Sequence, residues 1–230
     1  MITDQTLVLV PGLDGTGDLF KPLLQVIPPE VDTVIIEYPR DKVLSKNNLA
    51  EIVRNQIPRN KPIVILAESF SGPLVINLLK HHPFDLKGVV FCATFARSPR
   101  KILLNLIKIL PLSYLLRLPI PDSLLKYFCV GVDASKELIF IVKEAIRAVN
   151  PEVLAERLRI LANIDESDSI RALANTSCSF IQALDDKLVP KHCLKDFING
   201  IPNLKITAIP GSHFILQAKP KECWNIIKQI

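Results

Sequence analysis

The sequence predicts an α/β protein: a doubly wound, mostly parallel sheet of about six strands, with helices on both faces and an all-helical insertion. Short apolar runs rich in β-branched residues recur along the chain, and helical patterns separate them. Most of these runs are continuously apolar, which is typical of strands buried on both faces of a parallel sheet. The alternation of strands and helices favours right-handed crossovers.

The expected elements follow one another in a regular order. Strands are expected at residues 7–10, 33–36, 63–66, 89–92, 180–184 and 206–209. Helices are expected at residues 19–26, 49–56, 71–81, 191–198 and 219–230. In an open sheet of this kind ligands bind beyond the carboxyl ends of the strands, so the loops that follow the strands are the first place to look for a site.

One stretch interrupts this order. Between Arg97 and Asp168 the sequence has helical patterns, several prolines and no good strand. Connections in compact domains usually span a handful of residues, so this stretch is too long for a simple crossover. We expect residues 98–168 to form a helical cap, inserted into a core made of residues 1–97 and 169–230.

A candidate nucleophile follows the third expected strand. Residues 63–66 lead into Ala67-Glu68-Ser69-Phe70-Ser71-Gly72, and a helical pattern begins there. A serine on a sharp strand-to-helix turn has an exposed hydroxyl, and the residues two before and two after it must be small to avoid a clash. The dipole of the following helix stabilises negative charge at this point. The alternative is a serine that only caps the helix.

The loop after the first strand is rich in glycine, from Pro11 to Gly17. Such a loop can hold a phosphate, but its spacing matches neither common nucleotide-binding motif, and Asp14 would repel the phosphate. Two further candidates lie near the C-terminus. Asp185 and Asp186 follow the expected strand 180–184, and His213 follows the last strand, 206–209. The alternatives are a helix-capping aspartate and an ordinary surface or core histidine.

These motifs together resemble the α/β-hydrolase family over residues 7–230. The order serine, aspartate, histidine is that of the family, and each member follows its own expected strand. The loop LVLVPGLDGTG and the turn AESFSG are most similar to small bacterial hydrolases and to the plant phytyl-ester-synthase group. The segment LAERL, residues 154–158, is similar to the pimeloyl-carrier-protein methyl esterase group.

The resemblance implies a role for each matching residue. Ser69 is the nucleophile, His213 the general base, and Asp186 the acid that orients the histidine. The backbone amides of Leu13 and Phe70 are the donors of an oxyanion hole. The residue before Gly12 is a proline where the family usually has histidine, which matters little because the donor is a backbone group.

Asp186 is preferred to Asp185 because it stands four residues before Pro190, as in the acid turn of the family. Consecutive residues that leave a strand point in opposite directions, so only one carboxylate can readily face His213. Asp185 is then expected to face away and to bond backbone amides of its own turn.

The implied activity is hydrolysis of a carboxylic ester or thioester through an acyl-enzyme intermediate, without metal or organic cofactor. An acyltransferase with the same triad and a non-catalytic ligand-binding protein of the same fold are the alternatives. Leucine and isoleucine crowd residues 102–116, and this apolar segment must be buried somewhere. It packs among the cap helices or also lines a pocket for an apolar acyl chain of a small-molecule substrate.

Composition excludes several other classes of function. The net charge is +5 without any run of basic residues, which disfavours nucleic-acid binding. Five cysteines without a CxxC pair disfavour a disulfide framework and a zinc site. The apolar residues 101–121 are interrupted by Lys108, Pro111 and Arg117, so no transmembrane helix is expected. No basic segment precedes the first apolar run, so no signal peptide is expected and the predicted location is cytoplasmic.

Overall fold

The computed structural model describes residues 4–81, 84–107 and 109–230, so Lys108 of the apolar stretch and the first three residues lie outside it. The described residues contain one six-stranded sheet in the order β2-β1-β3-β4-β5-β6, and every neighbouring pair is parallel. All six expected strands are confirmed. Their bounds are β1 Thr6–Val10, β2 Thr33–Ile35, β3 Ile63–Glu68, β4 Leu86–Cys92, β5 Cys178–Ala183 and β6 Lys205–Ile209.

The strand order reverses at β1, which lies between β2 and β3. The neighbouring inner strands β1 and β3 are buried throughout, as their continuously apolar sequences predict. The edge strand β6 differs, because four of its five residues are exposed and only Ile209 is buried. Ligands bind in open α/β sheets at the carboxyl ends of strands beside such a reversal, which places the site beyond β1 and β3.

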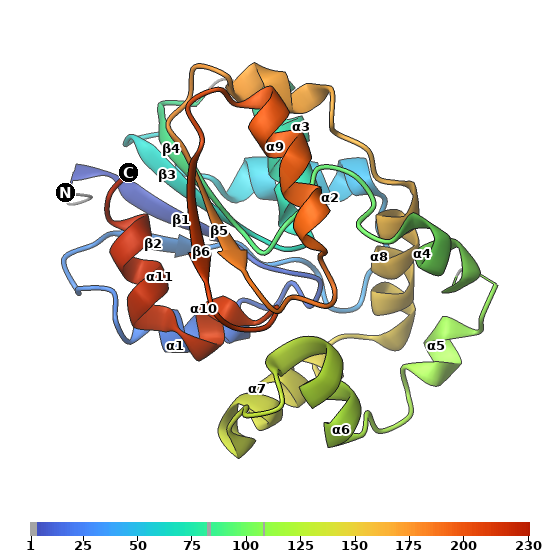
Figure 1. The fold of residues 1–230 in the computed structure, drawn as a ribbon. Coiled ribbons are helices and arrows are strands. Elements are labelled where there is room, and N and C mark those ends of the chain that lie inside the picture. Colours follow the sequence, from blue (N-terminus) through green and yellow to red (C-terminus); the bar gives the residue numbers. More distant parts are fainter. Residues whose placement is uncertain (1–3, 82–83, 108) are drawn as a thin grey trace.

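Helices cover both faces of the sheet (Figure 1). The face packed by α2 Lys46–Gln56, α3 Ser71–His81 and α9 Leu194–Gly200 forms the larger core cluster. The opposite face is packed by α1 Lys21–Leu24, α10 Ile215–Ala218 and α11 Pro220–Ile227. The expected helix 219–230 is α11, which begins at Pro220 and ends at Ile227, and the short helix α10 precedes it. Pro220 has no N–H to continue α10 and is the first residue of the new helix.

Between β4 and β5 the described residues form helices only, apart from one antiparallel bridge that joins Arg97 to Asp165. Their bounds are α4 Lys101–Ile107, α5 Leu112–Leu115, α6 Asp122–Leu125, a π-helical turn at Lys126–Val130, α7 Lys136–Arg147, α8 Pro151–Asn163 and a 3₁₀ helix at Ser169–Leu173. Ser135 caps α7 and Asn150 caps α8 through their side-chain oxygens. That residues 98–168 are a separate cap stays a prediction.

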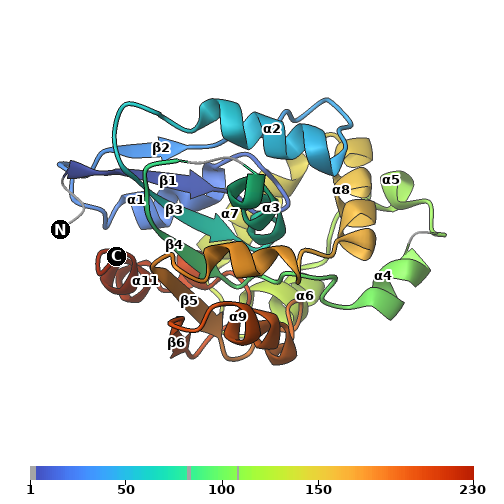
Figure 2. The same ribbon diagram turned by 90° about the horizontal axis from the view of Figure 1, so that it is seen from above.

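Within this insertion both α4 and α5 pack on α8. Both views draw α4 and α5 on the side of α8 that faces away from the strands (Figures 1 and 2). No helix of the described residues is long and apolar enough to cross a membrane.

Candidate active site

Ser69 stands at the sharp turn from β3 to α3, where the sequence predicts the nucleophile. Its φ angle is +49°, a left-handed conformation that costs energy for any residue but glycine. The turn is held by its backbone: Ser69 N–H donates to Cys92 O at 2.9 Å, and Ser69 O accepts from Gly72 N at 3.2 Å and from the Thr94 hydroxyl. A Cβ on Gly72 would collide with the Thr94 side chain, so this position requires glycine.

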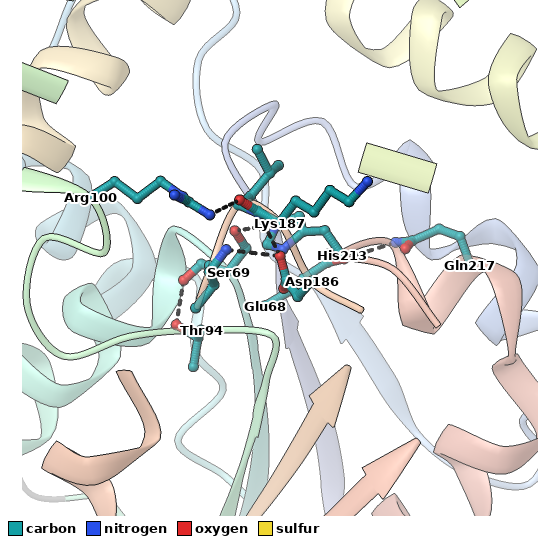
Figure 3. A network of polar contacts seen from close by, with 10 residues as sticks. Glu68, Ser69, Thr94, Arg100, Asp186, Lys187, His213 and Gln217 are labelled. Carbon is teal, nitrogen blue, oxygen red and sulfur yellow. Dashed lines mark hydrogen bonds and ion pairs between the residues drawn. The ribbon is translucent and has the colours of Figure 1, made fainter. Parts of the chain in front are cut away.

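The structure brings together the three side chains expected to form a triad. His213 follows β6 and Asp186 follows β5, so both project at the carboxyl edge of the sheet beside Ser69 (Figure 3). Ser69 Oγ lies 2.9 Å from His213 Nε2. His213 Nδ1 lies 2.7 Å from Asp186 Oδ2. The side chains of His213 and Asp186 are 10% and 3% exposed, so little water competes for these bonds.

The two adjacent aspartates are distinguished by their positions. Asp185 is exposed, and its backbone N–H bonds Gly211 O at 2.9 Å. Asp186 points inward, and its Oδ1 accepts hydrogen bonds from the amides of Leu188 and Val189, both at 2.8 Å. The expectation that Asp185 bonds the amides of this turn is therefore wrong, because Asp186 bonds them with one oxygen while the other faces His213.

The environment of His213 favours its charged form. Burial of the ring lowers the pKa, but the charge and hydrogen bond of Asp186 and the nearby Glu68 outweigh it, so the pKa of His213 is raised above its usual 6.5. An imidazole of raised basicity, with its Nδ1 fixed by a carboxylate, is suited to accept a proton from a hydroxyl at Nε2.

A cavity of about 320 Å³ lies in front of Ser69. Leu13, Phe70 and His213 line it together with Ser69, which places both expected oxyanion donors at the same space as the serine. No hydrogen bond from the amide of Leu13 or Phe70 is found among the described residues. The described residues thus supply no acceptor for either amide.

No family model matches the chain, and no curated protein matches it in sequence. Its architecture, however, is similar to solved structures over nearly its whole length. A lipase-esterase related protein from Clostridium acetobutylicum has a TM-score of 0.75 at 18% identity, with 98% of this chain and 94% of that chain covered. An α/β hydrolase enzyme, MGS-M2, from a Medee basin deep-sea metagenome has a TM-score of 0.74 at 12% identity, with 100% and 90% covered.

The chain has the α/β-hydrolase fold. A thermophilic esterase from Thermogutta terrifontis has the same architecture, with a TM-score of 0.78 at 17% identity over 98% of this chain and 88% of that chain. At such identities the likeness concerns the fold, and function has to be argued from the site.

Three features of the candidate site have no signal in the sequence. The first is Arg157 of α8, which is only 2% exposed. Its Nη1 donates to the carbonyl oxygens of Leu13 at 2.8 Å and Asp14 at 2.6 Å, and its Nη2 donates to Pro39 O at 3.0 Å. The guanidinium also lies 5.3 Å from the ring centre of Tyr38. A helix of the insertion thereby holds the loop that carries an expected oxyanion donor.

The second is a buried chain of hydroxyl groups behind the nucleophile. The Tyr38 hydroxyl lies 2.6 Å from Ser71 Oγ, which in turn donates to the carbonyl oxygen of Pro11. Ser71 is thus more than a small residue that the turn requires. It bonds the start of the glycine-rich loop to the turn that carries Ser69, so the relative position of the two expected oxyanion donors is fixed.

The third is Glu68, the residue before the nucleophile. Its side chain lines the cavity and is buried, and Oε1 accepts a hydrogen bond of 2.9 Å from Gln217 Nε2 (Figure 3). No hydrogen-bond partner for the buried Oε2 is found among the described residues. Burial raises the pKa of Glu68 to about 7, so the carboxyl changes charge near neutral pH.

The walls of the cavity are mainly apolar and come largely from the insertion. They include Leu104 of α4, Val142 of α7 and Leu154 and Leu158 of α8. Only part of the apolar crowd at residues 102–116 is used in this way, since Ile102 and Ile109 are 82% and 81% exposed. The expectation that this segment is buried is wrong for these residues. Among the described residues no cluster of His, Cys, Asp and Glu is arranged to hold a metal ion.

Proposed function

We propose that the protein is a serine hydrolase that cleaves a carboxylic ester or thioester through an acyl-enzyme intermediate. One observation carries this proposal: three side chains form a hydrogen-bonded chain beside a cavity. Ser69 Oγ lies 2.9 Å from His213 Nε2, and His213 Nδ1 lies 2.7 Å from Asp186 Oδ2. A serine hydroxyl is a weak nucleophile until an adjacent base accepts its proton, and this arrangement supplies the base and fixes its orientation.

In the first half of the reaction His213 Nε2 takes the proton of Ser69 as Oγ forms a bond to the acyl carbon. The carbonyl π electrons move to the oxygen, and the amides of Leu13 and Phe70 stabilise the oxyanion. Each donor of this kind is worth roughly 10²–10³ in rate. The oxyanion then collapses, the bond to the leaving alcohol or thiol breaks, and His213 returns the proton to the leaving group.

In the second half a water molecule takes the place of the leaving group. His213 accepts a proton from this water as its oxygen attacks the acyl-enzyme. The second tetrahedral intermediate then collapses, the bond from Ser69 Oγ to the acyl carbon breaks, and His213 returns the proton to Oγ as the acid is released. Asp186 orients the His213 ring and stabilises the imidazolium in both halves. An alcohol in place of water would give the acyltransferase alternative from the same intermediate.

The apolar cavity walls support a small-molecule ester with an apolar acyl chain as the substrate. A cavity of about 320 Å³ is within the size range of small-ligand sites.

A fluorophosphonate probe and a panel of p-nitrophenyl esters test the proposal. The probe should label the wild-type protein at Ser69, and peptide mapping locates the label. Ser69→Ala should abolish labelling and ester hydrolysis with little change in melting temperature, because only one hydroxyl is removed. Labelling at another serine, or undiminished hydrolysis by Ser69→Ala, would overturn the assignment. Product analysis with an added alcohol separates transfer from hydrolysis.

A further inference from the structure

Exposed apolar side chains are concentrated on the insertion. Of the sixteen exposed large apolar side chains of the described residues, thirteen lie between Ile102 and Phe140. The other three, at Val43, Ile198 and Ile206, are scattered over the core. Single exposed apolar residues are normal on soluble proteins, but a concentration of them marks an interaction surface.

Many of these exposed aliphatic side chains lie on α4 and on the residues that follow it. Leu104 is 8% exposed, whereas three other apolar residues of the helix, Ile102, Leu103 and Leu106, are exposed. The polar residues Lys101 and Asn105 are exposed beside them. We call the exposed aliphatic residues of this stretch the outer apolar face: Ile102, Leu103, Leu106, Ile109, Leu110 and Leu115. Helix α4 thus exposes apolar as well as polar residues, which is not the pattern of a helix that only covers a core.

The chain segment that carries this face is basic in sequence, although Asp165 after α8 interacts electrostatically with Arg97 and Lys101. Residues 97–121 contain five lysine and arginine residues and no aspartate or glutamate. Arg97 is paired with Asp196, and Arg117 lies 3.8 Å from Glu152, but Lys101 at the start of α4 is exposed and has no ion pair among the described residues. Aliphatic residues beside basic ones favour the surface of a bilayer that contains anionic lipids.

A second copy of the chain suits this face less well. In a two-fold interface the same patch meets itself, so the basic residues at its edge would face each other and repel. A bilayer surface accepts aliphatic side chains without needing a complementary protein shape, and its anionic headgroups attract the basic residues.

The outer apolar face is continuous with the cavity in front of Ser69. Leu103 is 50% exposed and also lines the cavity, and Arg100 beside it lines the cavity as well. A surface that contacts α4 would therefore also contact the edge of the cavity. An apolar molecule could then pass from that surface into the cavity without crossing bulk water.

We propose that the outer apolar face binds the surface of a bilayer containing anionic lipids, with α4 at the interface and the cavity edge at Leu103 turned toward it. The consequence for the substrate rests on the proposed function: the esters cleaved would be those that partition into the lipid phase. The binding itself does not depend on the triad.

Co-sedimentation with phosphatidylcholine vesicles, with and without phosphatidylglycerol, tests the binding. Ile102→Glu/Ile109→Glu places charge on the outer apolar face at positions that do not line the cavity. Val43→Glu/Ile198→Glu is the matched control, since those side chains are exposed to 55% and 49% on the core. Wild type, the control and Ser69→Ala should bind the anionic vesicles alike. The Ile102/Ile109 variant should bind at least tenfold more weakly while it hydrolyses a water-soluble ester at the wild-type rate.

Failure of the wild-type protein to bind anionic vesicles overturns the proposal, as does equal binding by the wild type and the Ile102/Ile109 variant. Equal binding to vesicles with and without phosphatidylglycerol overturns the role of the basic residues. Sedimentation velocity without lipid tests the remaining outcome. If the wild type is a dimer that does not bind vesicles and the Ile102/Ile109 variant is a monomer, this face is a contact between two copies of the chain. Ser69→Ala should lose ester hydrolysis and still bind the vesicles. A failure of the proposed function can therefore be distinguished from a failure of vesicle binding.

Discussion

Arg157 Nη1 donates a hydrogen bond of 2.8 Å to the carbonyl oxygen of Leu13, the residue whose amide is a proposed oxyanion donor. The same nitrogen bonds the next carbonyl, of Asp14, at 2.6 Å. Two successive peptide groups are thereby fixed by one rigid guanidinium, which presents its donors in a planar fork. We infer that Arg157 is a positioning residue for the oxyanion loop, held in place by α8 of the insertion.

Arg157→Met should lower kcat by roughly 10²-fold, because small displacements of groups around a reacting centre cost that much. KM should change less, since the cavity walls stay in place. Arg157→Lys should recover part of the loss, because an ammonium can bond one or two of the three carbonyls. The control is Arg159→Met on the same helix, whose side chain is 40% exposed and pairs with Glu156. Equal kcat values for the two methionine variants would contradict the role of Arg157.

The sequence is sufficient to locate Ser69, Asp186 and His213 because each stands in a local motif at the end of its own strand. The shape of the strand-to-helix turn and the carboxylate that precedes Val189-Pro190 are properties of a few neighbouring residues. The parallel sheet then brings the ends of the strands to one edge, so the correct strand assignment is enough to bring the three side chains together.

Arg157 and Tyr38 could not be assigned from the sequence, because their partners are backbone carbonyls or a hydroxyl far away in the chain. The choice of carbonyl that an arginine bonds depends on how α8 packs on the sheet, which no local pattern records. The exposure of Ile102 and Ile109 could not be predicted from the sequence either. An apolar run indicates that the segment tends to be buried, but it does not indicate which part of the protein covers it.

The two adjacent aspartates give a matched pair of variants. Asp186→Asn should lower kcat by several orders of magnitude, because an amide at this position favours the wrong tautomer of His213; a drop near 10⁴ is known for such a change in a serine protease. Asp185→Asn should leave kcat almost unchanged, since Asp185 is exposed. Steady-state kinetics measure both, and circular dichroism checks the fold. A crippled Asp185→Asn beside an active Asp186→Asn would reverse the assignment.

The pH dependence of activity should involve Glu68. His213 must be neutral to accept the proton of Ser69, so kcat/KM falls as the pH drops through the pKa of His213. The negative charge of Glu68 contributes to the raised pKa of His213. Glu68→Gln removes this charge and should shift the acid limb of the profile to lower pH. A limb that stays in place, or moves to higher pH, would show that Glu68 does not act on His213.

The same carboxyl should make stability depend on pH. The folded-state pKa of Glu68 is about 7, above its ordinary value of 4.5, so the folded protein keeps a proton that the unfolded chain loses. This contribution to stability is complete below 4.5 and is lost as the pH rises through about 7, by about 3 kcal/mol in all. Urea unfolding at both ends of this range measures the free energy of unfolding of wild type and of Glu68→Gln. As the pH rises, the variant should become more stable relative to the wild type. A constant difference would mean that Glu68 titrates normally.

The last prediction concerns the length of the acyl chain. The cavity in front of Ser69 has a volume of about 320 Å³ and mainly apolar walls. Each methylene that moves from water into such a cavity contributes up to ~0.8 kcal/mol, which is up to about fourfold in kcat/KM. For p-nitrophenyl esters kcat/KM should therefore rise from acetyl toward about octanoyl, until the cavity is filled.

A filled cavity should shorten this profile. Leu158 of α8 is a half-buried residue of the cavity wall, so Leu158→Trp takes up space without overpacking a fully buried core. Its optimum should move to shorter chains, with the acetyl ester least affected. Leu124→Trp on α6 is the matched control, because Leu124 is 48% exposed and does not line the cavity. A wild-type profile that is flat or falls over this range would count against an apolar acyl site, and a shift shared by both tryptophan variants would show that the cavity walls do not set the chain length.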